Sequence, residues 1–227
     1  MRSDYLISAE KLTLAYGENK VIISADFEIK PGDFVCVVGA NGSGKSTLIK
    51  AILGFIKPKS GKIRYATGFS KTEIGYLPQE SKIDPNFPAT VYEIVLSGTL
   101  GQLGLKPFYR PENRTRALEA LKSLHIEKLK SKSFGDLSGG QKQKVLLSRA
   151  LSATSRLLIL DEPSNNLDHA SRREFYEILK NLNRSGLTII MITHDLDADD
   201  LIGDKILALE NGKVSSFSTV DFLRSFK

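Results

Sequence analysis

One stretch decides the fold of this chain: Gly39-Ala40-Asn41-Gly42-Ser43-Gly44-Lys45-Ser46-Thr47. It matches the pattern G-x-x-x-x-G-K-[ST] of a phosphate-binding loop, and it stands between the apolar run 34–38 and the segment 48–53. This order predicts a strand, a glycine loop and a helix. The glycines let backbone N–H groups turn toward an anion, and the positive end of the helix reinforces the site. Lys45 is then expected to reach the phosphates and the Ser46 hydroxyl to bind Mg²⁺. The plain alternative is a glycine turn between a buried strand and a helix.

Length and composition indicate one globular domain spanning 1–227, because 227 residues can bury a large core and 41% of them are apolar. The net charge of +6 comes from scattered lysines and arginines, which favours general solubility, and no nucleic acid partner is expected. Cys36 is the single cysteine and lies in an apolar run, which fits a reducing compartment. No apolar run is long enough to cross a bilayer, and the N-terminus lacks a signal-peptide core. The chain is therefore expected to be cytosolic unless a partner holds it at a membrane.

Residue patterns predict the remaining elements in order. Two runs rich in β-formers, 6–14 and 21–29, predict a hairpin. From about 90 to 124 apolar residues recur at helical spacing, which predicts a helical insert, and Pro111 suits a helix start. We expect this insert to be part of an inserted helical subdomain at about 88–150. Asn211-Gly212 predicts a hairpin turn, and Ser218 with Asp221 predicts a helix cap. Strands are also expected at 62–65, 73–77, 157–160, 187–193, 206–209 and 214–217, and helices at 142–153 and 172–182.

Two carboxylates, Asp161 and Glu162, follow the apolar run Leu157-Leu158-Ile159-Leu160. Such a run fits a buried parallel strand, and open α/β sheets carry their ligand sites at the carboxyl ends of the strands. Asp161 is expected to orient Mg²⁺, and Glu162 to polarise the attacking water. Pro163 is expected to keep Glu162 extended. The alternative for this pair is a solvated strand end.

The ordered set of motifs resembles the ATP-binding cassette (ABC) ATPases over nearly the whole chain. Besides the phosphate loop and the Asp161-Glu162 pair, the resemblance rests on Gln79 at the glutamine-loop position, the signature Leu137-Ser138-Gly139-Gly140-Gln141, the loop Ser164-Asn165-Asn166-Leu167-Asp168, and His194. It implies an α/β fold. That fold is a P-loop NTPase with a mainly parallel core sheet, an N-terminal antiparallel β subdomain and an inserted helical subdomain.

The resemblance also implies a role for each motif. ATP would be bound by Tyr16, which would stack on the adenine, and by Gly39, Asn41, Gly42, Ser43, Gly44, Lys45, Ser46 and Thr47. The signature residues Ser138, Gly139, Gly140 and Gln141 would bind the γ-phosphate of ATP held on another subunit. Mg²⁺ would be bound by Ser46, Gln79 and Asp161. The catalytic residues would be Glu162, His194, Gln79 and Lys45, with Asp168 at the subunit interface.

One copy of each motif implies a head-to-tail pair with a second copy of the chain. The resemblance further implies an integral-membrane permease as partner, and thus a location on the cytoplasmic side of a bacterial cell membrane. The segment 84–98 resembles that of bacterial zinc and manganese importer ATPases, where Phe-Pro-x-Thr-Val leads into the helical subdomain. We therefore expect the ATPase subunit of a metal-ion importer, zinc first and manganese second, served indirectly by a metal-binding substrate-binding protein.

Several alternatives to a metal importer stay open. The ATPase could serve another importer or an exporter. A DNA-maintenance ATPase would place a long coiled coil between the phosphate loop and the signature, where this chain has a short helical insert. A translation-associated protein would carry two cassettes, and a silent regulatory cassette would typically lose the equivalent of Glu162 or His194.

Two stretches depart from the family pattern. Asn165-Asn166 stand where a small or glycine residue often precedes Leu-Asp, and Lys142-Gln143-Lys144 follow the signature where glutamine and arginine are common. Neither departure is expected to touch a catalytic atom. Both would instead affect interface affinity and coupling to the partner.

Overall fold

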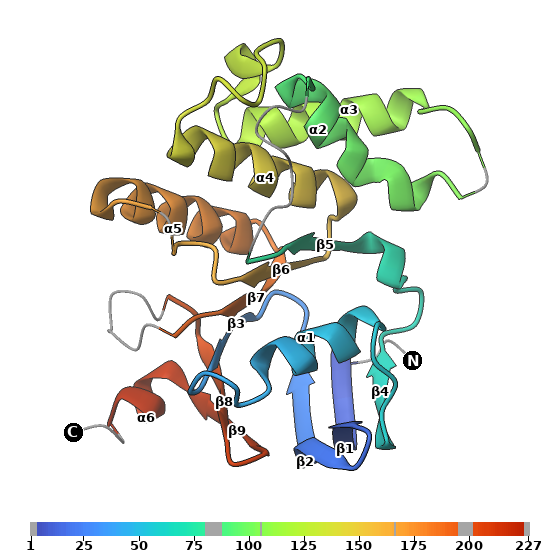
Figure 1. Ribbon diagram of the computed structural model, residues 1–227, viewed down its shortest axis with the longest axis vertical. Coiled ribbons are helices and arrows are strands. Elements are labelled where there is room, and N and C mark those ends of the chain that lie inside the picture. Colours follow the sequence, from blue (N-terminus) through green and yellow to red (C-terminus); the bar gives the residue numbers. More distant parts are fainter. Residues whose placement is uncertain (1–3, 80–87, 105, 166, 195–201, 225–227) are drawn as a thin grey trace. The chain divides into compact units, whose positions relative to one another are not determined.

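The chain forms two structural units, which Figure 1 colours along the sequence. The computed structural model describes residues 4–79, 88–104, 106–165, 167–194 and 202–224. The first unit combines residues 1–71 with 183–227, and the second comprises residues 72–182. The chain thus leaves the first unit after the phosphate-loop region and returns to it for its last strands.

The first unit begins with a three-stranded antiparallel sheet in the order β2-β1-β4. Its central strand pairs with both neighbours and buries Ile7, Leu12 and Leu14 completely. The antiparallel pairing of β1 with β2 confirms the predicted hairpin, although a register shift between Ala9 and Leu12 interrupts the regular ladder. The strands are β1 (Ile7–Tyr16), β2 (Asn19–Ile29) and β4 (Ser60–Tyr65).

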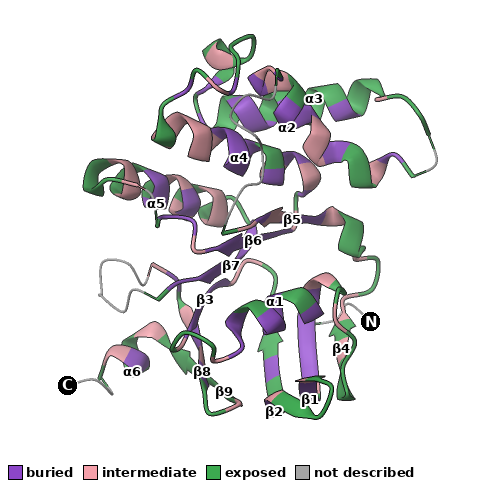
Figure 2. Ribbon diagram, in the orientation of Figure 1, coloured by how far each residue is buried: buried purple, intermediate pink, exposed green. Residues whose placement is uncertain are grey.

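The parallel strands of the first unit carry the phosphate loop. β3 pairs in parallel with β7 on one side and β8 on the other, and β9 returns antiparallel to β8. Every residue of β3 and β7 is buried, as strands covered on both faces should be (Figure 2). The elements are β3 (Phe34–Val38), α1 (Lys45–Leu53), β7 (Thr188–Ile192), β8 (Lys205–Glu210), β9 (Lys213–Ser218) and α6 (Thr219–Arg224).

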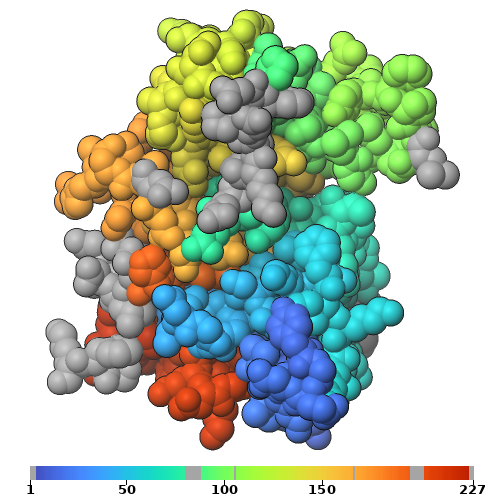
Figure 3. Space-filling view, in the orientation of Figure 1, coloured from blue at the N-terminus to red at the C-terminus, as the bar shows by residue number. Residues whose placement is uncertain are grey.

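The turn between β8 and β9 lies close to β2. Asn211 and Gly212 have φ angles of 49° and 78°, the left-handed pair that a two-residue hairpin needs, so the predicted turn is confirmed. Gly212 O accepts a hydrogen bond from Ile23 N of β2 at 2.7 Å. The space-filling view shows the surfaces of the N-terminal strands, in blue, and of the C-terminal hairpin, in red, next to each other (Figure 3).

The described residues of the second unit form a parallel strand pair, β5 with β6, and the helices α2, α3, α4 and α5. α4 packs against α2, α3 and β5 (Figure 1). None of the helices that the structure describes is long and apolar enough to cross a membrane. The elements are β5 (Ile74–Leu77), α2 (Val91–Ser97), α3 (Pro111–Ser123), α4 (Gly139–Ala153), β6 (Leu157–Asp161) and α5 (His169–Arg184).

Capping side chains explain where these helices begin. Pro111 is the first residue of α3, as predicted. α4 begins at Gly139, earlier than predicted, because the Ser138 hydroxyl accepts the N–H of Gln141 and the Gln141 side chain accepts the N–H of Ser138. α2 begins with a similar capping box, formed by Thr90 and Glu93. Residues 84–87 of the stretch that resembles metal importers lie outside the described residues.

Candidate active site

The phosphate loop is a tight glycine turn between β3 and α1. Gly39, Gly42 and Gly44 have φ angles of 151°, 80° and 104°, a range that favours glycine. A Cβ on Gly39 would lie 2.4 Å from the carbonyl oxygen of Leu209, and one on Gly44 would lie 2.7 Å from a methyl carbon of Val21. The first and last of the three glycines are therefore needed for close packing as well as for backbone conformation.

Two polar side chains of the loop point to an anion as its ligand. Lys45 is only 6% exposed, and its ammonium donates to the carbonyl oxygens of Gly39 at 2.8 Å and Ala40 at 3.0 Å. The Ser43 hydroxyl is buried and has no hydrogen-bond partner among the residues that the structure describes. A buried hydroxyl without a partner is costly, and a phosphate oxygen would satisfy it. The loop therefore fits the phosphate group predicted for it.

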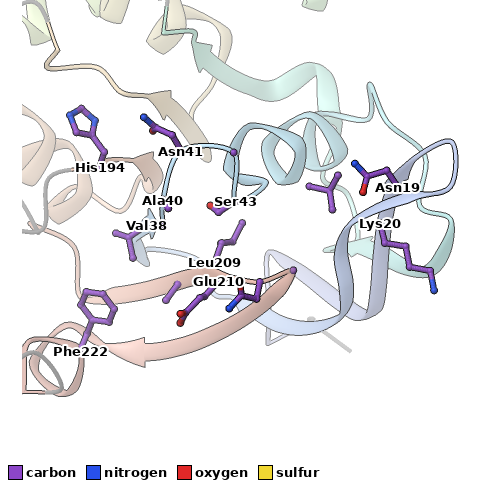
Figure 4. Close-up of a pocket in the computed structure, with 16 residues that line it drawn as sticks. Asn19, Lys20, Val38, Ala40, Asn41, Ser43, His194, Leu209, Glu210 and Phe222 are labelled. Carbon is purple, nitrogen blue, oxygen red and sulfur yellow. The ribbon is translucent and has the colours of Figure 1, made fainter.

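A cavity of about 980 Å³ lies against the loop, large enough for a nucleotide (Figure 4). The loop residues 39–43 form part of its wall, and His194, which follows β7, forms another part. Tyr16 ends β1 and is 52% exposed, and its cross-strand partner Asn19 lines the cavity. The other lining residues come from β2, from the end of β3, from the β8–β9 hairpin and from α6: Lys20, Val21, Val38, Ala208, Leu209, Glu210, Asn211, Gly212 and Phe222.

The two remaining loop residues occupy the first turn of α1. Ser46 is exposed, whereas Thr47 is buried. The Ser46 side chain is thus accessible, and its role as a metal ligand stays a prediction. Thr47 lies against the core, and its role in binding ATP stays a prediction as well.

In the second unit, the predicted metal and base carboxylates stand at the end of β6. Asp161 is the last residue of the strand and is 6% exposed. The Tyr76 hydroxyl of β5 donates to Asp161 Oδ2 at 3.4 Å. Burial, followed by the charge of Asp161, raises the pKa of Tyr76 to about 12, so the phenol keeps its proton beside the carboxylate. Gln79 Nε2 donates to Glu162 Oε2 at 2.7 Å, so the structure brings these two predicted residues together.

The expectation that Pro163 keeps Glu162 extended is wrong. Glu162 has a φ of 48°, in the left-handed region. The chain turns immediately after β6, and Asn165 N donates back to Glu162 O at 3.5 Å. The turn overrides the local preference of a residue before proline. A left-handed backbone costs a residue other than glycine about 1–2 kcal/mol, and such strain gathers at functional sites.

The expectation that neither departure from the family pattern touches a catalytic atom is also wrong, but only for Asn165. Asn165 Nδ2 donates to Glu162 Oε2, the oxygen that Gln79 also contacts, at 2.5 Å. Gln143 Nε2, on α4, donates to the carbonyl oxygen of Pro163 at 2.6 Å. No local pattern predicts this contact, because it depends on the turn at Glu162, which the sequence did not predict. Asn166 lies outside the described residues.

The signature forms the start of α4 and one wall of a small cavity of about 160 Å³. Ser138, Gly140 and Gln141 contribute to this wall, which Lys144, Leu167, Ser171, Glu174 and Phe175 complete. Lys144 forms an ion pair with Glu174 at 2.7 Å.

Hydrogen bonds from the backbone and hydroxyl of Ser171 lower the pKa of Asp168, which therefore stays ionised at neutral pH.

Together, the glycine loop after a buried strand and the carboxylate pair after another define a phosphate-loop nucleotide hydrolase. The family model for ABC transporters matches residues 23–165, more than half of the chain. The chain therefore belongs to the ABC transporter family and is one of its ATPases, with ATP as substrate. The predicted fold is confirmed by the solved structures below.

Curated relatives match nearly the whole chain. The zinc transport system ATP-binding protein TroB of Treponema pallidum is 36% identical, over 94% of this chain and 84% of the relative. The high-affinity zinc uptake system ATP-binding protein ZnuC of Bacillus subtilis is 37% identical, over 92% of both chains. The manganese transport system ATP-binding protein MntA of Synechocystis is 32% identical, over 89% of this chain and 80% of the relative.

Solved structures match in fold as well as in sequence. CbiO1 of Clostridium perfringens, part of an ABC transporter complex, is 31% identical with a TM-score of 0.84, over 99% of this chain and 92% of that chain. A bacterial ABC transporter cassette solved as a dimer is 29% identical with a TM-score of 0.75, over 94% of this chain and 98% of that chain.

Proposed function

We propose that this chain is the ATP-hydrolysing subunit of an importer for a divalent metal ion, zinc first and manganese second. The observation that carries the proposal is the nearly full-length similarity to TroB and ZnuC, joined to a phosphate loop whose geometry fits a nucleotide. In this proposal residues 1–227 form one ABC ATPase domain, in which about 88–150 form the helical signature subdomain.

In this proposal the first unit binds ATP. The backbone N–H groups of residues 39–44 would hold the phosphates, and the Lys45 ammonium would exchange its two carbonyl partners for phosphate oxygens. The buried Ser43 hydroxyl would gain a partner in the same exchange. Asn41 lines the cavity beside it. Tyr16 is not among the lining residues, but its exposed ring would stack on the adenine.

Mg²⁺ would be held by Ser46, Asp161 and Gln79, all of which carry the oxygen atoms that this ion prefers. The Gln79 amide is already oriented, because its Nε2 donates to Glu162 and its Oε1 is the atom that could bind a hard cation. When bound, the ion neutralises charge that develops on the phosphates.

Glu162 would polarise the attacking water as general base, and His194, on the cavity wall, would contact the γ-phosphate. A second copy of the chain would supply Ser138, Gly139, Gly140 and Gln141 to the same phosphate, because these residues form a helix N-terminus. The dimeric cassette among the solved structures supports such a pair. ATP would then close the dimer and hydrolysis would release it.

A permease embedded in the membrane would receive this motion, and a metal-binding protein would deliver the ion to the permease. The chain would thus work at the cytoplasmic side of the cell membrane. An importer of another substrate, or an exporter, is the alternative that the same site chemistry would serve.

Glu162→Gln tests the catalytic part of the proposal. The amide cannot accept the proton of water, so the variant should bind ATP and accumulate as a dimer in gel filtration with ATP and Mg²⁺, with only a small residual rate of phosphate release. Turnover at the wild-type rate would refute the base assignment.

Cellular metal content tests the transport part. A strain that lacks this chain should contain less zinc than its parent in chelator-treated medium, and added zinc should restore growth. The control is the same strain complemented with Lys45→Ala, which should stay depleted. Unchanged zinc with depleted manganese would move the assignment to manganese, and depletion of neither would refute a metal importer.

A further inference from the structure

We infer that Asn165 is a positioning residue for ATP hydrolysis. With Gln79 it forms an amide clamp, by which we mean the two side-chain N–H donors on Glu162 Oε2. The inference rests on the proposed role of Glu162 as general base. It assigns a catalytic consequence to a position where the family pattern often places a small residue.

The clamp consists of two donors that reach one oxygen from different segments. Gln79 follows β5, and Asn165 lies in the turn after β6. The hydrogen bond from Gln79 to Glu162 Oε2 measures 2.7 Å, at the short end for an N–H donor to a charged acceptor, and the one from Asn165 is shorter than a normal hydrogen bond. Two donors from separate directions restrict the carboxylate far more than one would, because rotation of the glutamate side chain breaks at least one bond.

The turn that presents Asn165 is itself held in place. The Pro163 carbonyl accepts a hydrogen bond from Gln143 of α4. The Ser164 and Tyr176 hydroxyls are hydrogen-bonded to each other at 3.0 Å, and both residues are at least 95% buried. Asn165 therefore extends from a fixed support, which a side chain needs if it is to orient another.

The clamp matters because a general base acts only when its oxygen lies within reach of the water proton. Glu162 has several rotatable side-chain bonds and starts from a left-handed backbone, so it would sample many carboxylate positions on its own. If the carboxylate is fixed before the reaction, the entropic cost of orienting it no longer adds to the activation barrier. Loss of one donor should then lower kcat and leave ATP binding to the phosphate loop unchanged.

Three variants test the inference: Asn165→Ala, Asn165→Asp and the matched control Asn181→Ala, an exposed asparagine on α5. We expect Asn165→Ala to lower kcat about ten-fold, within the range for a hydrogen bond to a charged group. Asn165→Asp should lower kcat further, because a second carboxylate would repel Glu162. In both variants, the KM and the equilibrium Kd for ATP should stay within about two-fold of wild type. The thermal midpoint should stay within about 2 °C of wild type. Asn181→Ala should match wild type in all four.

Two results would overturn the inference. One is an Asn165→Ala enzyme whose kcat stays within about two-fold of wild type. The other is a fall in kcat accompanied by an equal loss of ATP affinity or by a lowered thermal midpoint, which would indicate a structural role.

A double variant separates this inference from the base assignment. On the Glu162→Gln background, Asn165→Ala should reduce the residual turnover by less than two-fold, because the group that it positions is already absent. A further ten-fold loss would show that Asn165 acts elsewhere and would overturn the inference. Wild-type turnover by Glu162→Gln alone would instead refute the proposed base, whatever Asn165 does.

Discussion

Replacing Gly39 with alanine tests how tightly the phosphate loop is packed. The new Cβ would lie 2.4 Å from the Leu209 carbonyl oxygen and 2.7 Å from Ser43 Oγ. The Leu209 oxygen belongs to the backbone of a paired strand, so it cannot rotate away. Overpacking of this kind costs about 1–3 kcal/mol, and a backbone at φ 151° costs alanine about 1–3 kcal/mol more. We expect a total of about 4 kcal/mol.

For a chain of this size, about 4 kcal/mol lowers the thermal midpoint by about 8–16 °C. Calorimetry of Gly39→Ala beside Gly68→Ala provides the test, because Gly68 has φ 74° and an added Cβ there would meet nothing within 4 Å. Gly68→Ala should show the backbone cost alone, about 1–2 kcal/mol, or about 2–8 °C. Equal midpoints for the two variants would refute the reasoning, since the clash with Leu209 would then contribute nothing.

Three further predictions concern the loop lysine, the support of the acidic turn and the buried thiol. Lys45→Ala should release no measurable phosphate from ATP, because the loop loses its ammonium; turnover above a tenth of wild type would contradict this. Gln143→Leu should lower the free energy of unfolding by about 1–3 kcal/mol in urea titrations, since the Pro163 carbonyl loses its donor, and an unchanged midpoint would count against that contact. Burial raises the pKa of the Cys36 thiol from 9.0 to about 12. The folded thiol therefore keeps its proton where the unfolded one loses it, so stability falls as pH rises from 9 toward 12. Cys36→Ala should remove that part of the decline, and identical pH profiles for both proteins would disprove it.

Local sequence patterns were enough to predict much of the fold and, within the site, the phosphate loop. The phosphate loop, the Asn211-Gly212 turn and the Ser218 cap are each specified by residues within a few positions of one another, and all three form as predicted. The buried strands were also predicted, because uninterrupted apolar runs are typical of strands covered on both faces. The family then followed from the order of the motifs.

The sequence was less informative about features that depend on contacts between segments distant in the chain. The left-handed backbone of Glu162 follows from a turn anchored by α4, and the rule for residues before proline does not include that contact. Asn165 was noted as unusual, yet its hydrogen bond to Glu162 depends on the same turn. Likewise, the contact between Gly39 and Leu209 joins residues 170 positions apart, a pairing that local spacing cannot predict.

The capping box at the start of α4 has a consequence for the chemistry of the signature. Ser138 Oγ accepts the Gln141 N–H through a lone pair, so the hydroxyl proton is not consumed by the cap. One side chain can therefore complete its own helix and still donate to a phosphate oxygen on a second copy, the role proposed for it. Aspartate or asparagine would preserve the first task, but aspartate has no proton to donate and would repel the phosphate. Helix stability and nucleotide contact can thus be lost independently at this position, and in the proposed dimer the side chain needs to accept and donate at once.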